Sequence, residues 1–228
     1  MDYVFPPAPA VSLPVLSGKR FPVNRVFCIG QNYAAHVREM GGDPAKTAPV
    51  FFMKPASAVI PNGSTLPYPP ATRNLQPEVE LVVALQRGGR DIPAELVEQE
   101  YVFGYAVGLD MTRRDLQWAA KDKGEPWDMA KAFDGSAPCS AITPLQQSGI
   151  ISRGRIALRV NGEVRQDSDV SDMILHVPQI VHQLSTLVEL QVGDLIFTGT
   201  PAGVAPVLSG DRLEATVAEL ETLTITLG

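Results

Sequence analysis

Three carboxylates stand at the ends of two segments that have the pattern of β-strands. Glu78 and Glu80 open an apolar run that ends at Leu85, and side chains two residues apart on a strand point to one face. Residues 101–110 form a second run, rich in aromatic and β-branched residues, that ends at Asp110. If the three acids meet, they offer hard oxygen ligands without sulfur or imidazole. That set suits Mg²⁺, and it also accepts Mn²⁺ or Ca²⁺.

Two carboxylates on one strand face repel each other unless something compensates them. At ~5 Å and an effective dielectric of ~20, Glu78 and Glu80 repel by about 3 kcal/mol. A shared proton, basic partners or a metal ion would offset this repulsion, whereas a solvated strand end would avoid it. Gly104 and Gly108 share the strand face of Asp110, and their small size predicts an open pocket in front of that acid.

His36 and Glu39 form the second chemical feature, because they lie three residues apart in a segment of helical composition. On a helix, such side chains share one face with their Cβ atoms about 5–6 Å apart. A carboxylate beside an imidazole selects its tautomer and raises its basicity, as a general base requires. The alternative interpretation is an ordinary surface pair.

Short strands joined by turns must position these side chains. The chain has 19 glycines and 20 prolines in 228 residues, an excess that disfavours a helical bundle. Asn161-Gly162 predicts a β-hairpin. No linker divides the chain, so we predict a single α+β domain, rich in strands, over residues 1–228, with a Pro-rich N-terminal arm at 1–21. Strands are predicted at 25–29, 50–53, 78–85, 101–110, 156–160, 163–166, 194–198, 212–217 and 222–227, and helices at 32–40, 112–123 and 174–190.

Composition excludes several classes of protein. The formal net charge of −6 argues against a nucleic-acid-binding surface, which needs a basic face. No apolar run reaches the ~18 residues of a membrane span, and the N-terminus has no secretory signal pattern, so a cytoplasmic protein is expected. Cys28 and Cys139 are too few for a disulfide framework.

Six short segments follow one another in a specific order along nearly the whole chain, from about residue 25. In that order they resemble the fumarylacetoacetate hydrolase superfamily, and within it most closely the bacterial fumarylpyruvate hydrolases and related acylpyruvases. The segments are Gly30-Gln31-Asn32-Tyr33 with His36 and Glu39, Phe52-Met53-Lys54-Pro55, Asn74-Leu75 before Glu78 and Glu80, Gly108-Leu109-Asp110-Met111-Thr112, Ala130-Lys131-Ala132-Phe133-Asp134, and Thr198-Gly199-Thr200-Pro201-Ala202-Gly203-Val204.

The resemblance implies a mixed β-roll with a few flanking helices, a divalent metal, a homodimer and hydrolysis of a carbon–carbon bond in 3-acylpyruvates. It implies metal ligands at Glu78, Glu80 and Asp110, and a water-activating dyad at His36 and Glu39. It places Lys131 near the metal as a catalytic cation, and Lys54, Gln117 and Thr200 along the substrate. A role in the catabolism of aromatic compounds is implied on the same ground.

The expected reaction joins these groups. His36, oriented by Glu39, would remove a proton from water, which attacks the distal carbonyl, while the metal and Lys131 stabilise the pyruvate enolate that leaves. Gln31 departs from the family's frequent arginine, and Gln cannot make the charge-assisted contacts that Arg makes with carboxylates. A different substrate tail or weaker binding follows if that position contacts substrate.

Two alternatives stay open from the sequence. The same site could decarboxylate oxaloacetate or isomerise keto acids, because decarboxylation uses the metal but no attacking water. The acids could instead hold a structural cation in a non-enzymatic binding module, which would need neither the dyad nor nearby lysines. No residue identified from the sequence recognises the acyl end of the substrate.

Overall fold

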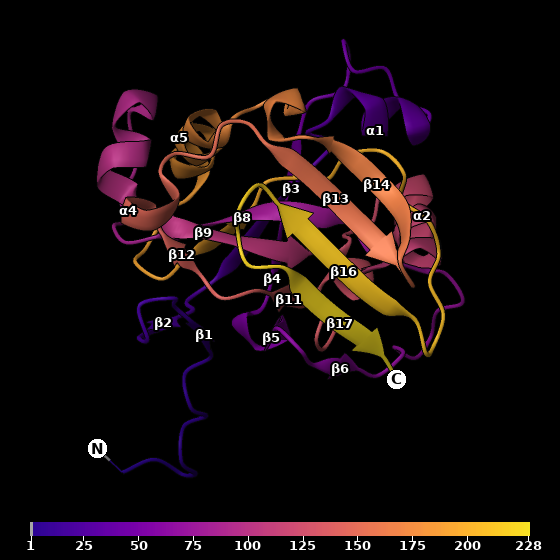
Figure 1. The fold of residues 1–228 in the computed structure, drawn as a ribbon, viewed down its shortest axis with the longest axis horizontal. Coiled ribbons are helices and arrows are strands. Elements are labelled where there is room, and N and C mark those ends of the chain that lie inside the picture. Colours follow the sequence, from indigo (N-terminus) through magenta and orange to yellow (C-terminus); the bar gives the residue numbers. More distant parts are fainter. Residues whose placement is uncertain (1) are drawn as a thin grey trace.

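Two β-sheets packed face to face form the body of the protein, and a computed structural model describes residues 2–228 (Figure 1). The larger sheet has eight strands in the order β4-β3-β15-β8-β9-β11-β5, with β12 paired to β9. Its strands are β3 (Val26–Gly30), β4 (Val50–Lys54), β5 (Val59–Pro61), β8 (Val79–Leu85), β9 (Val102–Leu109), β11 (Ala137–Cys139), β12 (Thr143–Pro144) and β15 (Leu195–Phe197).

The second sheet has five strands in the order β14-β13-β16-β17-β6. Its first two strands form the hairpin predicted from Asn161-Gly162, where both residues adopt the positive φ that the tight turn requires. These strands are β6 (Thr65–Leu66), β13 (Arg155–Val160), β14 (Glu163–Asp169), β16 (Arg212–Val217) and β17 (Leu223–Leu227). The predicted strand-rich α+β fold is confirmed.

The main hydrophobic core fills the space between the sheets, where β13 and β16 contact β8 and β9. All seven residues of β8 are buried, which explains why its sequence is apolar on both faces. Leu81 and Val83 point into this core, whereas Val82 and Ala84 point to a second apolar cluster on the other face of the larger sheet.

The N-terminal arm contributes to that second cluster. Within residues 1–21 the structure contains a small hairpin, β1 (Ser12–Pro14) with β2 (Arg20–Pro22), whose Leu13 and Phe21 are buried against the larger sheet. The sequence predicted an extended surface arm here, so part of the arm is more tightly packed than expected.

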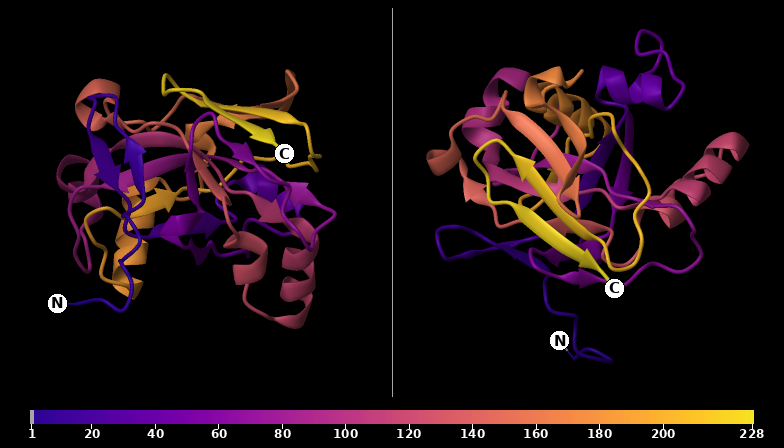
Figure 2. Two further views of the ribbon diagram at one scale, coloured as in Figure 1. Left: turned by 90° about the horizontal axis from the view of Figure 1, so that it is seen from below. Right: turned by 45° about the vertical axis from the view of Figure 1, so that its right-hand side comes forward.

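Helices are short and lie at the periphery (Figure 1). They are α1 (Ala34–Glu39), α2 (Arg114–Lys123), α3 (Asp128–Lys131), α4 (Leu145–Ser148) and α5 (Val177–Leu187), with helical turns at Ala56–Ala58, Ala94–Leu96, Val97–Tyr101 and Val170–Asp172 and a two-stranded pair β7 (Leu75–Gln76) with β10 (Thr112–Arg113). Figure 2 shows α2 projecting from the body of the molecule. No helix within residues 2–228 has the length and apolarity to cross a bilayer.

The glycines of β9 pack against neighbours, so the open pocket predicted in front of Asp110 from their small size is wrong. A Cβ atom on Gly108 would lie 2.5 Å from side-chain atoms of Phe197 and Val82, and one on Gly104 would lie 2.2 Å from the Thr143 carbonyl oxygen. The absence of side chains lets β9 approach its neighbours closely.

We therefore expect Gly108→Ala to lower the free energy of unfolding by about 1–3 kcal/mol, the usual cost of overpacking a core. Urea unfolding followed by circular dichroism measures it. Gly89→Ala is the matched control, because the added Cβ would meet only ordinary contacts of 3.4 Å or more. Equal stability of the two variants would contradict the close packing at Gly108.

Candidate active site

Antiparallel pairing brings the three carboxylates together. In the β8–β9 ladder Val79 faces Leu109 and Glu80 faces Gly108, so the start of β8 lies beside the end of β9. The Asp110 N–H donates to the Glu78 carbonyl at 2.9 Å, which extends the pairing to the acids themselves. One carboxylate oxygen from each of Glu78, Glu80 and Asp110 lies within 4.8 Å of the others, and all three residues are buried.

Glu78 is held ionised by two cations. Lys131 Nζ lies 2.8 Å from its Oε2, and the Arg114 guanidinium pairs with its Oε1. Burial opposes the charge of this carboxylate, but Lys131 and Arg114 outweigh burial and hold the pKa of Glu78 well below its usual range. Arg114 is itself buried and also donates to Gln76 and Gln117, so its guanidinium is fixed in orientation.

Two lysines hold Asp110. Lys54 Nζ lies 2.8 Å from its Oδ1 and Lys131 Nζ lies 2.7 Å from its Oδ2. Both lysines are at most 2% exposed, so neither is a surface lysine. Burial disfavours the charge of Lys131, yet the neighbouring Asp110 and Glu78 raise its pKa above the usual value.

Glu80 differs from the other two acids. Its Oε2 accepts a hydrogen bond from the Gly199 N–H at 2.7 Å, but among residues 2–228 no cationic side chain forms an ion pair with it. Burial, together with the like charges of Asp110 and Glu78, raises the pKa of Glu80 well above its usual range. Glu80 is therefore the acid of the cluster whose ionised form is least favoured while no cation lies beside it.

A divalent cation fits this donor set. Oxygens that share Mg²⁺, Mn²⁺ or Ca²⁺ at about 2.1–2.4 Å lie at most about 4.2–4.8 Å apart, which matches the separation of the three acids. The ligands are all carboxylate oxygens, as hard cations prefer. A cation beside Glu80 would offset the burial and the like charges that raise the pKa of this carboxyl, and it would favour the ionised form. Metal binding by Glu78, Glu80 and Asp110 is thus supported by geometry and by charge.

The predicted dyad is formed in α1. His36 Nδ1 lies 3.0 Å from Glu39 Oε2, and Glu39 Oε1 accepts from the Gly203 N–H at 2.8 Å, which holds the carboxylate in place. With Glu39 ionised, the short contact requires the proton on Nδ1, so Nε2 carries a free lone pair. The buried Asn32 anchors the chain just before α1 by donating to the Thr198 carbonyl at 2.8 Å.

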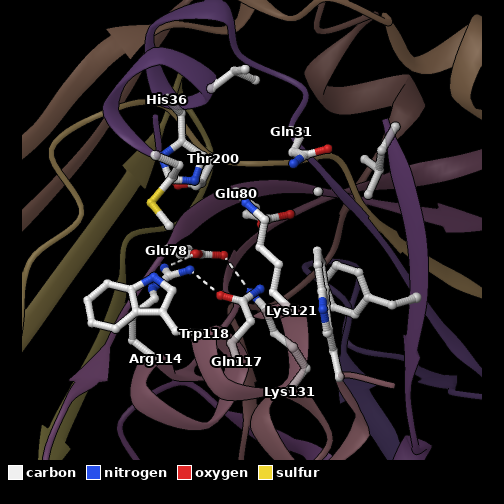
Figure 3. Close-up of a pocket in the computed structure, with 16 residues that line it drawn as sticks. Gln31, His36, Glu78, Glu80, Arg114, Gln117, Trp118, Lys121, Lys131 and Thr200 are labelled. Carbon is white, nitrogen blue, oxygen red and sulfur yellow. Dashed lines mark hydrogen bonds and ion pairs between the residues drawn. The ribbon is translucent and has the colours of Figure 1, made fainter. Parts of the chain in front are cut away.

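A single pocket is lined by His36 of the dyad and by Glu78 and Glu80 of the acid cluster (Figure 3). Of the residues predicted from the sequence, the structure places His36, Glu78, Glu80, Gln117, Lys131 and Thr200 in its lining. Glu39 contacts His36, and Lys54 contacts Asp110. Glu39, Lys54 and Asp110 are not among the residues that line the pocket. Gln117 is not a solvated helix residue, because it is buried and accepts a hydrogen bond from Arg114. Thr200 is also buried and donates to the Val79 carbonyl at 2.8 Å.

Sequence reasoning missed several lining residues. From the sequence, Arg113 and Arg114 could hold a carboxylate or be surface charges. In the structure Arg114 is the partner that the buried Glu78 requires. The helical spacing of Arg114, Gln117, Trp118 and Lys121 could have placed them on related faces of one helix. Gln31 also lines the pocket, with a positive φ of 65° that non-glycine residues adopt at an energetic cost.

Comparison with known proteins gives consistent results. Residues 25–227 match the family model described as fumarylacetoacetate (FAA) hydrolase C-terminal. The chain is 43% identical to a fumarylpyruvate hydrolase of Ralstonia sp over 78% of this chain and 92% of that protein. It is also 43% identical to oxaloacetate tautomerase FAHD1, mitochondrial, of Homo sapiens, over 87% and 89% of the two chains. The crystal structure of fumarylpyruvate hydrolase from Pseudomonas aeruginosa in complex with Mn²⁺ and pyruvate superimposes with a TM-score of 0.97 at 48% identity, covering 99% of each chain.

Proposed function

The chain belongs to the fumarylacetoacetate (FAA) hydrolase family, and on that premise we propose that it hydrolyses a carbon–carbon bond in 3-acylpyruvates, with fumarylpyruvate as its substrate. Fumarate and pyruvate are the products. The observation that carries the proposal is that His36, which Glu39 contacts, lines the same pocket as Glu78 and Glu80 of the acid cluster. Hydrolysis needs both a base for water and a site for the negative charge that develops on the keto acid.

A divalent cation held by Glu78, Glu80 and Asp110 would supply Lewis-acid stabilisation to oxygens of the keto acid. The carboxylates have to stay ionised for this, and the cations around them ensure that Glu78 does. Lys131 donates to Glu78, Asp110 and the Thr112 hydroxyl, so its three N–H groups are all used within the protein. It contributes positive charge and orients two carboxylates, without a donor left over for substrate.

The dyad performs the proton transfers. His36 Nε2 accepts a proton from water, and the resulting hydroxide adds to the carbonyl carbon that is distal to the pyruvate moiety. Glu39 stabilises the imidazolium that forms. The carbon–carbon bond then breaks, its electron pair stays with the pyruvate fragment, and a proton is returned to that carbon. The acyl fragment departs as a carboxylate.

We further propose Mg²⁺ as the working cation, a homodimer, a cytoplasmic location and a role in the catabolism of aromatic compounds. Mg²⁺ is supported by the all-carboxylate ligand set, which accepts Mn²⁺ as well. The crystal structure of the similar enzyme contains Mn²⁺. The homodimer, the location and the catabolic role rest on the resemblance to the family.

Purified protein is expected to consume fumarylpyruvate with 1 mM Mg²⁺ and to release equimolar pyruvate. Loss of the diketo-acid absorbance, with pyruvate measured by a coupled dehydrogenase, follows the reaction. Chelation with EDTA should abolish turnover, and added Mg²⁺ or Mn²⁺ should restore it. Turnover that survives complete metal removal would contradict the proposal.

Oxaloacetate tautomerisation is a second candidate, favoured by the 43% identity to a protein of that name. Tautomerisation or decarboxylation of oxaloacetate needs the cation site but no attacking water, so the two activities place different demands on the dyad. Rates on fumarylpyruvate, acetylpyruvate and oxaloacetate, measured side by side at fixed Mg²⁺, separate them. A kcat/KM for oxaloacetate above that for fumarylpyruvate would favour the second candidate.

A further inference from the structure

One cation of the pocket has no counter-ion. Arg114 and Lys131 pair with the acid cluster, and so does Lys54 behind it. Lys121 also lines the pocket, yet within residues 2–228 no acidic side chain lies in ion-pair range of its ammonium group. A flexible, unpaired lysine at a pocket wall is available to an anionic ligand.

Lys121 lies away from the buried end of the pocket. It belongs to the last turn of α2, the helix that projects from the body of the molecule, and it is exposed to solvent. Its side chain extends from α2 toward the side on which Gln31 lies in the view of Figure 3. Trp118 and Trp127 also line the pocket and make part of its wall aromatic. The pocket thus has a buried acidic end and an open end with a free positive charge.

The proposed substrate has the complementary shape. Fumarylpyruvate is a dianion with one carboxylate at each end, and its reacting keto-acid portion has to lie at the buried end, beside the acid cluster and His36. The second carboxylate then lies on the far side of the scissile bond. Arg114 and Lys131 are neutralised by Glu78 and Asp110, so they offer little net charge to it.

We infer that Lys121 binds the distal carboxylate of the acyl group and makes the enzyme selective for acylpyruvates that end in a carboxylate. This inference rests on the proposed function. The neutral amide of Gln31, on the opposite side, adds hydrogen-bonding capacity without a second charge. Selectivity follows because an uncharged acyl group leaves the ammonium group of Lys121 without this contact, whereas a carboxylate forms a charge-assisted hydrogen bond.

The test compares fumarylpyruvate with acetylpyruvate, whose acyl end carries no charge. Lys121→Met should lower kcat/KM for fumarylpyruvate about ten- to hundredfold, mainly through KM, and leave acetylpyruvate within about twofold. Lys121→Arg should retain most of the selectivity. Lys123→Met is the matched control, because it removes an exposed lysine of the same helix that does not line the pocket.

The outcomes separate this inference from the proposed function. An equal loss on both substrates, or none on either, in Lys121→Met would overturn the role of Lys121 while hydrolysis by the wild type stands. Failure of the wild type on both substrates would overturn the proposed function. Fumarate binding, followed by ligand-observed NMR, gives a readout that does not depend on turnover. Fumarate binding that is weakened in Lys121→Met and kept in Lys121→Arg supports the carboxylate contact, and unchanged binding in both contradicts it.

Discussion

Replacing His36 by alanine is expected to lower kcat for fumarylpyruvate about 10²–10⁴-fold, the usual contribution of a positioned general base. The imidazole is held by Glu39 with its free Nε2 in the pocket lining, and no other histidine of residues 2–228 lines that pocket. Mg²⁺ affinity should change little, because His36 is not one of the acid ligands. Initial rates and calorimetric Mg²⁺ titration of the same preparation measure both quantities.

The control for this substitution is His182→Ala. His182 is exposed on α5, and its Nδ1 contacts the Ile92 carbonyl oxygen at 2.7 Å. His182 is not among the residues that line the pocket. Its variant should keep the wild-type rate. A His36→Ala enzyme that hydrolyses fumarylpyruvate at the wild-type rate would remove the dyad from the mechanism. Loss of oxaloacetate turnover by the same factor would show that the base serves both reactions.

Local sequence signals sufficed for the long strands of the fold. The apolar run of β8, the aromatic and β-branched run of β9 and the Asn161-Gly162 turn each specify their structure within a few residues. The pairing of β8 with β9 then places Glu80 opposite Gly108. Nothing in either segment alone encodes that register, so the meeting of the three acids was a hypothesis until the fold was known.

Short elements were not predictable in the same way. β5, β11 and β12 are two or three residues long, too short to show a periodic pattern. They are strands because β11 and β12 pair with the longer β9 and β5 pairs with β11. Leu13 and Phe21 illustrate the same limit, because only the apolar outer face of the larger sheet explains why the Pro-rich arm folds back.

The contacts of the candidate site also fall into those that local sequence predicts and those that depend on the whole fold. His36 and Glu39 are three residues apart, so a helix alone brings them together, and their pairing could be predicted. Arg114 reaches Glu78 across 36 positions and Lys131 reaches it across 53, so both contacts depend on the whole fold. The proposed role of Lys121 depends on the fold as well, because it rests on the lack of an acidic partner within residues 2–228, which a sequence does not display.

Glu80→Gln is expected to have opposite effects on the metal-free and the metal-bound protein. Without metal, burial and the like charges of Asp110 and Glu78 raise the pKa of Glu80, and within residues 2–228 no cation pairs with it, so this acid costs stability at neutral pH. Its replacement by Gln should raise the free energy of unfolding by about 1–3 kcal/mol. The corresponding rise in Tm is about 2–10 °C for a chain of this size. With the cation, the same substitution deletes a charged ligand, so Mg²⁺ and Mn²⁺ affinity should fall at least about 100-fold.

Thermal unfolding with EDTA and with 1 mM Mn²⁺ measures both effects in one experiment. Wild type should gain stability on adding Mn²⁺, because ligands that bind the native state stabilise it, whereas Glu80→Gln should start higher and gain little. Glu163→Gln is the control, since Glu163 is exposed on β14 and lies outside the acid cluster. A higher Tm without metal, together with a smaller gain in Tm from Mn²⁺, distinguishes this prediction from damage to the fold, because a damaged fold would lower Tm in both conditions. If Glu80 destabilises the metal-free protein and binds the cation, its replacement by Gln raises Tm without metal and removes the gain in Tm on adding Mn²⁺. A Glu80→Gln protein that binds Mn²⁺ with wild-type affinity would remove Glu80 from the ligand set.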